Sequence, residues 1–535
     1  MDAELVPETQ SLRDVYVAEP DTQQSLEPEQ QTRWNSLIKQ FKRRYGGAPG
    51  FVARSPGRVN IIGEHIDYSL YDVLPTALSV DVLVAVKTMP ASGPEATIKV
   101  DNTDPRFAAS EFVVSSDREV DIDASRPDWV NYFKAGLRVA IKYLREKNSA
   151  FVPANIEALV DGSVPPGGGI SSSAAFVCAS ALAIVKANGH NISKQELLDI
   201  SIVSERAVGV YSGGMDQAAS IFSRRGYLLY VTFFPKFKVQ HVAIPKATTD
   251  ITFMVAQSFV TSNKAETAPR HYNLRVAECT LAAVILAQKH NITLQKDSSS
   301  LGYSLRNLHH ELMRQDGRQD DPFEYQLDSL ILIVEETFKQ EQGYTRADIA
   351  ELLQLTVPQV EEQFLSSFPV EAERFYLRQR ALHCFKEARR VLDFRSCLAR
   401  SHKLDQQNLG YLGQLLNESQ ASCRDVYDCT CPEVDELCEI ARRAGSLGSR
   451  LTGAGWGGCT VHMVPLEKVE NVTKALKEEY YLKRWPDLDK EKLNQAMVIS
   501  KPSNGSILYV SQFFSSYFAL LNSANVVQGY WCCNN

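Results

Sequence analysis

The sequence predicts an α+β fold arranged in two lobes, with mixed sheets and helices. Stretches with the apolar pattern of strands and of helices follow one another without a strict strand–helix alternation, which disfavours a doubly wound parallel sheet. No segment of about 20–50 residues repeats along the 535 residues, which excludes a repeat architecture.

The first half of the chain supplies most of the predicted N-terminal lobe. An amphipathic helix is expected from about Trp34 to a stop before Gly46, followed by a strand over 51–54 and a polar turn over 55–57. Asp128 is placed to cap a helix, and Ser193 with Glu196 forms a capping box for another. The remaining predicted elements are strands over 80–86 and 156–160 and an apolar run over 174–185.

The second half begins with a strand over 251–256 and a long helix over 272–290. Residues 304–400 are predicted to be mostly helical and carry no sign of chemistry, and strands return at 459–464, 497–501 and 507–510. The predicted units are a disordered acidic tail (1–33), an N-terminal lobe (34–245), a C-terminal lobe (246–509) and an atypical C-terminal extension (510–535).

Charge is unevenly placed and excludes some classes of function. Residues 1–33 carry eight acidic and two basic residues, so this tail accounts for −6 of the net charge of −7. A nearly neutral body gives no electrostatic reason to expect nucleic acid as a partner. The uncharged segment 510–535 shows no period, which favours a disordered extension or a gene-model artefact over an amphipathic segment.

The lack of a recognisable targeting signal and the cysteine usage predict a cytoplasmic protein. The sequence shows no secretory leader and no run of 18 apolar residues, so neither secretion nor a membrane span is expected. The 11 cysteines are odd in number and lack that secretory context, which favours reduced thiols. A monomer is the default expectation because no heptads are present.

Three glycine-rich segments are candidates for chemistry. In the second one, over 164–176, three glycines and three serines precede an apolar helix, which suits an anion at a helix N-terminus; a serine-capped turn is the alternative. The first, over 55–68, places four charged or polar residues within ten positions: Arg58, Glu64, His65 and Asp67. They are candidates to bind hydroxyl and phosphate groups, and the alternative is a solvated loop with local ion pairs. The third, over 449–460, is explained by tight backbone packing between lobes.

A fourth segment, over 205–217, places an acid after a glycine turn. Asp216 follows Gly213-Gly214, and such an acid is a candidate general base, with a capped surface turn as the more common alternative.

Taken in order, the motifs resemble the GHMP small-molecule kinases. They are Pro-Gly-Arg-Val-Asn-x-x-Gly-Glu-His-x-Asp-Tyr, Pro-x-Gly-x-Gly-Ile-Ser-Ser-Ser-Ala and Leu-Thr-Gly-Ala-Gly-x-Gly-Gly. The first is the signature of the galactokinase branch, and the segments 417–423 and 261–264 look like its eukaryotic and fungal members. The resemblance spans roughly residues 35–510 and implies a two-lobed fold with the active site in the cleft between the lobes.

The resemblance implies ATP-dependent phosphorylation of galactose at its anomeric hydroxyl, in the first committed step of galactose catabolism. It makes Asp216 the acid that takes the proton from the C1 hydroxyl, with Arg58 stabilising charge beside it. Ser173 and Glu205 match Mg²⁺ ligands. Sugar contacts fall on Glu64, His65, Asp67, Gly214 and Tyr272. Contacts to ATP fall on Trp129, Tyr132, Gly167, Gly168, Gly169, Ser171, Ser172 and Ser173.

Two alternatives share these motifs. One is an N-acetylgalactosamine kinase, which differs in the space around the C2 substituent. The other is a galactose- and ATP-binding co-inducer that binds a transcriptional repressor, and a bifunctional protein would combine both roles.

Overall fold

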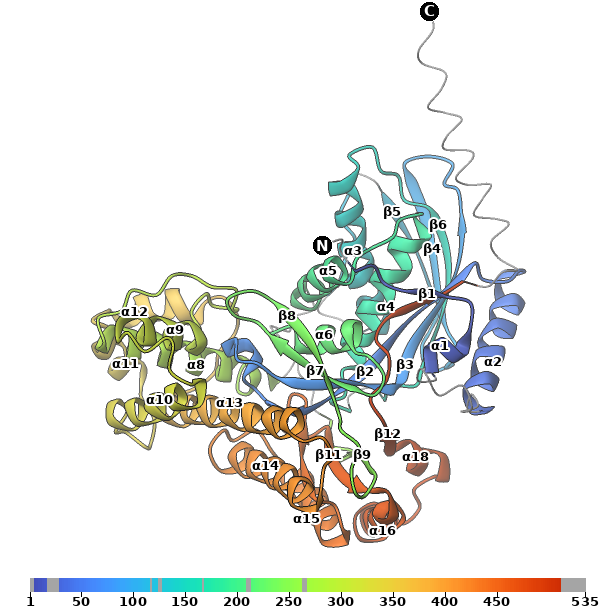
Figure 1. The fold of residues 1–535 in the computed structure, drawn as a ribbon. Coiled ribbons are helices and arrows are strands. Elements are labelled where there is room, and N and C mark those ends of the chain that lie inside the picture. The colour runs from blue at the N-terminus through green and yellow to red at the C-terminus, as the bar shows by residue number, and fades with distance from the viewer. Residues whose placement is uncertain are drawn as a thin grey trace, which may run out of the picture.

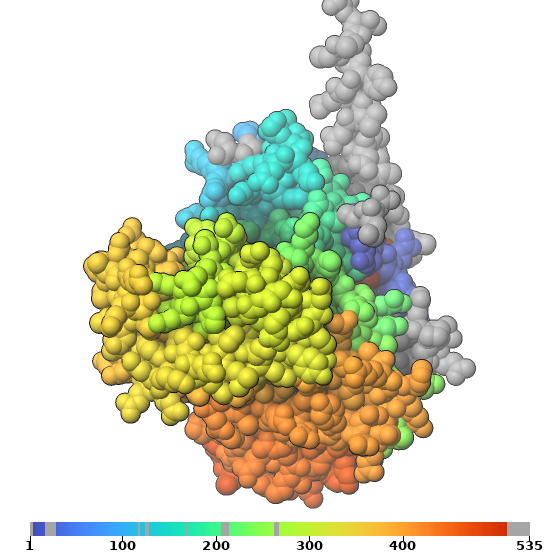
Figure 2. Space-filling model, turned by 60° about the vertical axis from the view of Figure 1, so that its left-hand side comes forward, coloured from blue at the N-terminus to red at the C-terminus, as the bar shows by residue number. Residues whose placement is uncertain are grey.

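The computed structural model describes residues 4–16, 28–115, 118–123, 128–165, 168–207, 213–261 and 267–510, and the side chains of 205–207 lie outside that description. Two main sheets organise the chain, a seven-stranded one in the upper lobe of Figure 1 and a four-stranded one in the lower lobe. Helices from the middle of the sequence pack beside both, and Figure 2 shows them against the N-terminal and C-terminal parts of the chain. The predicted α+β fold in two lobes is confirmed.

The seven-stranded sheet is mixed. Its order is β1 (Glu8–Thr9), β13 (Ile507–Tyr509), β2 (Phe51–Ile62), β3 (Leu74–Met89), β6 (Asn155–Gly162), β4 (Glu95–Asn102) and β5 (Ser110–Ser115). The pairs β1–β13 and β4–β6 are parallel, and the other four are antiparallel. This pattern rules out a doubly wound parallel sheet.

Helices cover both faces of this sheet, which explains why every residue of β2 is buried. Alternate strand residues point to opposite faces, so Val52 packs with Trp34 and Leu37 while Ala53 belongs to the main core. The helices on the Val52 face are α1 (Leu12–Tyr16) and α2 (Pro28–Tyr45). Those on the other face are α3 (Trp129–Lys147), α4 (Ser172–Ala187), α5 (Lys194–Ala207) and α6 (Met215–Phe222).

The N-terminal segment corrects the expectation of a disordered tail over 1–33, in the parts that the structure describes. β1 adds a strand to the sheet, and α1 buries Val15 completely. The Tyr16 hydroxyl donates to Asp81 (2.8 Å), and Arg33 pairs with Asp81 (2.6 Å). This docking could not be predicted from the sequence, because the segment carries only a few isolated apolar residues without any period. Those residues pack against a sheet formed by other parts of the chain.

A second correction concerns the predicted turn over 55–57. β2 runs through these residues without turning back, with a shift in its register against β3 between Pro56 and Arg58. A bulge of this kind accommodates proline, which has no N–H for the ladder, and re-aims the side chains that follow.

The C-terminal lobe is built on an antiparallel sheet in the order β10 (Gly448–Thr452), β11 (Cys459–Pro465), β9 (Ile251–Gln257) and β12 (Met497–Ser500). The predicted strands over 251–256, 459–464 and 497–501 correspond to three of these. β7 (Tyr227–Thr232) and β8 (Lys238–Ala243) form a hairpin that contacts the loop after β2 through a bridge between Val73 and Val231.

Helices make up most of the other described residues, as predicted for 304–400. In order they are α8 (Tyr272–Lys289), α9 (Leu305–Gln315), α10 (Phe323–Thr337), α11 (Arg346–Leu353), α12 (Val357–Val360), η2 (Glu361–Leu365), α13 (Leu377–Arg400), α14 (Gln406–Asp425), α15 (Pro432–Ala444), α16 (Val469–Ala475), η4 (Leu476–Tyr481), α17 (Leu482–Arg484) and α18 (Lys490–Gln495). Short 3₁₀ turns lie at η1 (Asp67–Ser69) and η3 (Leu466–Lys468).

The end of the C-terminal lobe also departs from the predicted boundary. β13 lies within 246–509 but pairs with β2 in the N-terminal sheet, so the chain crosses back between the lobes after β12. Within the described part of the chain, no helix has both the length and the apolarity to cross a membrane.

Candidate active site

At the register shift between β2 and β3, the first glycine-rich segment contacts the second. The Arg58 backbone N–H donates to the carbonyl of Ile170 at 3.1 Å. A β-carbon at Gly57 would lie 2.9 Å from that same carbonyl, so this close approach requires glycine. The two motifs are therefore held together by main-chain contact.

Arg58 and Asp216 form a buried ion pair. Nε and Nη2 of Arg58 lie 2.9 and 2.8 Å from Oδ1 of Asp216, and Nη1 donates to the carbonyl of Gly169 at 2.8 Å. The two residues are 2% and 6% exposed, so little water screens the pair. A carboxylate held beside a fixed guanidinium can accept a proton while the cation stabilises a neighbouring anionic oxygen.

Glu64 is a second buried carboxylate in this region. Arg450 donates to its Oε2 at 2.7 Å, and the Gly453 N–H donates to Oε1 at 3.2 Å. Burial raises the pKa of Glu64 to about 7, against the opposing effect of Arg450 and Arg58. The pKa of Glu64 therefore lies near neutral pH. Two groups of the third glycine-rich segment orient the carboxylate.

Asp67 lies against the start of α6. Burial, and then the charge of Asp216, raise the pKa of Asp67 to about 6. A β-carbon at Gly213 would lie 2.5 Å from the Asp67 carboxylate, and Gly214 precedes the helix with φ +97°. Two glycines therefore let the helix that carries Asp216 begin in contact with Asp67.

His65 is held by the protein through both ring nitrogens. Nε2 donates to the carbonyl of Ala454 at 3.0 Å, so Nδ1 accepts from the Tyr68 hydroxyl at 3.1 Å. Burial lowers the pKa of His65 well below its usual value, which keeps the ring neutral. A sugar hydroxyl has to compete with Ala454 for Nε2. Tyr272, the first residue of α8, places its ring 5.7 Å from that of His65.

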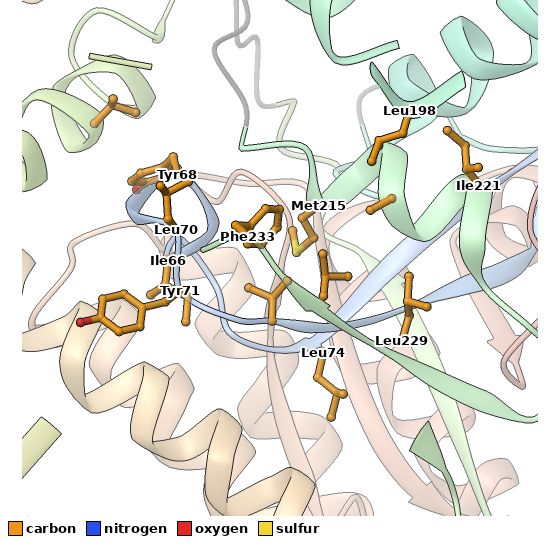
Figure 3. Packing of buried hydrophobic residues seen from close by; sticks show 14 of the residues in the cluster. Ile66, Tyr68, Leu70, Tyr71, Leu74, Leu198, Met215, Ile221, Leu229 and Phe233 are labelled. Carbon is orange, nitrogen blue, oxygen red and sulfur yellow. The ribbon is translucent and has the colours of Figure 1, made fainter. Parts of the chain in front are cut away.

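The apolar side of this loop is anchored in the main core. Figure 3 shows Ile66, Leu70 and Leu74 on the segment that follows His65, near Met215 of α6 and Phe233 after β7. This packing fixes the loop that presents Glu64, His65 and Asp67.

The second segment forms the N-terminus of α4. Ser171 precedes the helix with φ +60°, and its buried Oγ has no hydrogen-bond partner among the described residues. Ser172 and Ser173 lie in the first turn, where the main-chain N–H groups and the positive end of the helix favour an anion. Gly168 precedes this turn, and Gly167 lies outside the described residues.

The third segment supports the second through its backbone, as the sequence indicated. A β-carbon at Gly453 would lie 2.2 Å from the carbonyl of Gly169, and one at Gly458 would lie 3.3 Å from the Gly169 α-carbon. Glycines on both sides allow this packing between the lobes.

The predicted adenine-flanking aromatics lie beside α4. Asp128 caps α3 by accepting from the Val130 N–H, which confirms the predicted cap. Trp129 stacks on Phe176 of α4 with ring centroids 6.0 Å apart and planes 8° apart. Tyr132 follows one turn later on α3, so the two predicted aromatics share a face near the anion-binding turn.

Ser173 and Glu205 are the predicted metal ligands. Ser173 stands in the first turn of α4 and Glu205 near the end of α5, and these two helices pack together. A hydroxyl and a carboxylate are oxygen ligands of the kind that Mg²⁺ takes, although the Glu205 side chain lies outside the described residues.

One cavity collects most of the predicted catalytic and sugar-binding residues. Its lining residues are Arg58, Glu64, His65, Asp67, Met215, Asp216, Tyr272, Gly453 and Ala454. Gly214 is adjacent to it in sequence.

Three family descriptions match the chain: "Galactokinase galactose-binding signature" over 39–88, "GHMP kinases N terminal domain" over 131–224 and "GHMP kinases C terminal" over 401–482. The galactokinase of Saccharomyces cerevisiae is 42% identical over 498 residues, which cover 89% of this chain and 94% of the relative. The galactokinase of Schizosaccharomyces pombe is 39% identical over 501 residues, with 90% and 96% covered. This chain belongs to the galactokinase family.

Membership of the galactokinase family makes the chain a phosphotransferase. A solved galactokinase from Lactococcus lactis, complexed with galactose, superposes with a TM-score of 0.62 at 22% identity, covering 88% of this chain and 99% of that one. The two proteins share the fold.

Some residues of the site are not predicted from the sequence. Arg450 lies in the third glycine-rich segment, where the glycines are the more conspicuous feature, and Phe176 lies in the predicted apolar run. His383 and Glu387 of α13 lie in the region predicted to carry no chemistry, yet both contact the backbone of Glu64. Their spacing of four residues, which puts both on one helix face, was the available signal.

Proposed function

We propose that this chain transfers the γ-phosphoryl group of ATP to the C1 hydroxyl of D-galactose, giving galactose 1-phosphate and ADP. The observation that carries the proposal is the buried pair of Arg58 and Asp216, which lines one cavity with Glu64 and Asp67 beside the N-terminus of α4. The galactokinase names of its relatives support the same reaction.

Asp216 acts as the proton acceptor for the C1 hydroxyl. The acidity of a carboxyl and that of a sugar hydroxyl differ greatly, so base strength alone contributes little. Arg58 offsets this difference because its guanidinium lies on Asp216 and favours the anionic oxygen that forms as the proton leaves. Its third contact, to Gly169, ties the same cation to the segment proposed to bind phosphate.

The N-terminus of α4 holds the triphosphate. Ser171 supplies a buried hydroxyl without a described protein partner, and Ser172 and Ser173 supply main-chain N–H groups. In this proposal Trp129, which stacks on Phe176 of α4, and Tyr132 flank the adenine. Ser173 and Glu205 would hold Mg²⁺, which when bound supplies positive charge to the β- and γ-phosphate oxygens.

The sugar hydroxyls are bound by the loop after β2. Glu64 and Asp67 accept hydrogen bonds, and the ring of Tyr272 closes the cavity beside His65. Gly214 contributes its backbone where α6 begins.

A kinase assay tests the proposal directly. Purified protein is incubated with Mg-ATP and with galactose, N-acetylgalactosamine or glucose, ADP release is followed, and phosphorus NMR identifies the phosphorylated carbon. We expect turnover of galactose at C1. Activity confined to the acetylated sugar would make the protein an N-acetylgalactosamine kinase, and sugar binding without turnover would make it a galactose- and ATP-binding co-inducer.

A further inference from the structure

The backbone of Gly63 and Glu64 is held by side chains of α13, which belongs to the C-terminal lobe. Glu387 Oε1 accepts from the backbone N–H groups of Gly63 (3.0 Å) and Glu64 (3.2 Å) and from the Ser419 hydroxyl (2.7 Å). The Glu387 side chain is fully buried against the main chain of the loop that follows β2. A buried carboxylate needs a compensating positive charge.

Arg390 supplies that charge, with its Nε 2.7 Å from Glu387 Oε2. Burial opposes ionisation, but Arg390 and Arg450 outweigh it and hold the pKa of Glu387 at about 2. Glu387 is therefore an anion near neutral pH and makes charge-assisted hydrogen bonds to the loop.

His383 stands one turn earlier on α13 and binds the other end of the same residue. Its Nε2 donates to the carbonyl of Glu64 at 3.0 Å, and its Nδ1 accepts from the Ser422 hydroxyl at 2.9 Å. Burial lowers the pKa of His383 to about 4, so the ring is neutral, and the Glu64 carbonyl, which can only accept, requires the tautomer with hydrogen on Nε2. Both the N–H and the C=O of Glu64 are thus bound by side chains of one helix.

We propose that His383 and Glu387 are positioning residues for galactose: they fix the main chain of Gly63 and Glu64, and through it the direction of the sugar-binding side chains. The proposal rests on the sugar-binding role given above to Glu64 and Asp67. The catalytic pair is held separately, by β2, α6 and the carbonyl of Gly169. Loss of either positioning contact should therefore weaken galactose binding while leaving ATP binding and the chemical step nearly intact.

Paired substitutions at His383 provide the test. His383→Leu removes the donor and leaves the buried Glu64 carbonyl unpaired, so we expect the KM for galactose to rise about tenfold. His383→Gln places an amide N–H near the position of Nε2 and should recover most of that loss. For both variants we expect kcat and the KM for ATP to stay within about twofold of the parent.

Glu387→Leu and Glu387→Gln form a second pair, since the amide oxygen of Gln can still accept from the loop. Arg389→Met is the matched control on the same helix, because Arg389 pairs with Asp328 and Asp393 and is partly exposed. It should leave both KM values unchanged. The galactose-induced rise in Tm, measured on each variant, shows whether a folded protein has lost sugar affinity.

Several results would overturn the proposal. A fall in kcat without a change in the KM for galactose would do so, and so would equal losses in the Leu and Gln variants. Glu64→Gln, measured in parallel, separates the two levels of inference. If it leaves the KM for galactose unchanged, the sugar-binding role of the loop is wrong; if it raises that KM while His383→Leu does not, the positioning role alone is wrong.

If His383→Leu fails to fold, Ser422→Ala replaces it as the test. This substitution removes the hydroxyl that donates to His383 Nδ1 and orients the ring, and it leaves the imidazole in place. We expect a smaller rise of about threefold in the KM for galactose, and no rise would count against the proposal.

Discussion

Arg58 and Asp216, which are 158 residues apart in the sequence, meet through two guanidinium nitrogens on one carboxylate oxygen. Arg58 enters from a strand of the central sheet and Asp216 from the first turn of a short helix. The same guanidinium reaches the carbonyl of Gly169 in the segment before α4. A single cation therefore touches both the proposed proton acceptor and the proposed phosphate site.

Asp216→Asn tests the proton acceptor. The amide keeps the size of the side chain but cannot take a proton, so we expect kcat to fall about 10²–10⁴-fold. The dissociation constant for galactose, measured by calorimetry, should change only a few-fold, because Glu64 and Asp67 remain in place. A variant that retains near-normal turnover would show that Asp216 is not the proton acceptor.

Ser171→Gly tests the phosphate site. Glycine adopts the φ of +60° at this position without strain, so the substitution removes the hydroxyl and little else. Because Oγ has no partner among the described residues, we expect the Tm of the free protein to change little. The KM for ATP should rise several-fold with the KM for galactose unchanged. An unaltered KM for ATP would remove Ser171 from the nucleotide site.

Glu64→Gln tests the buried carboxyl through the pH dependence of stability. The pKa of Glu64 in the folded protein, about 7, lies above the ordinary value of 4.5. Between these values the folded state binds more protons than the unfolded state, so this group's contribution to stability falls as pH rises and levels off above about pH 7.

The measurement is the free energy of unfolding of the parent minus that of Glu64→Gln, from urea titrations at a series of pH values. We expect this difference to decrease from about pH 5 to pH 7, with a slope of at most about 1.4 kcal/mol per pH unit. A difference that is constant or rises over this range would contradict the raised pKa.

Tyr16→Phe tests the docking of the N-terminal segment. The hydroxyl donates to Asp81 at 2.8 Å and accepts from Trp34 Nε1 at 3.0 Å, so its removal should cost about 1–2 kcal/mol in the free energy of unfolding. Tyr325→Phe is the matched control, because Tyr325 is 59% exposed. Equal stability of the two variants would mean that the segment does not dock as described.

Short-range patterns were well predicted from the sequence. The cap at Asp128 and the capping box of Ser193 and Glu196 follow from side-chain and backbone groups within a few residues, and both are present. Predictions failed where the decisive partner lay elsewhere in the chain. Pro56 and Gly57 resemble a turn in isolation, but pairing with β3 and contact with Ile170 keep them extended.

The candidate site shows the same division. Its residue types could be identified because three motifs carry them at set spacings. That both ring nitrogens of His65 are engaged, by Ala454 and Tyr68, could not be predicted, since the two partners lie in different lobes. The supporting residues of α13 are not predicted, because a histidine and a glutamate four residues apart on a helix are typical of any amphipathic surface until their burial is known.

The sequence by itself determined the motifs, the α+β class and the kind of chemistry, because those depend on residue type and local spacing. The tertiary structure alone decided which charges are buried together, how Glu64 is clamped between Arg450 and α13, and that the acidic N-terminal segment belongs to the sheet. The physical reason is that desolvation and hydrogen-bond partnership depend on what surrounds a side chain in space, and those neighbours come from segments hundreds of residues apart.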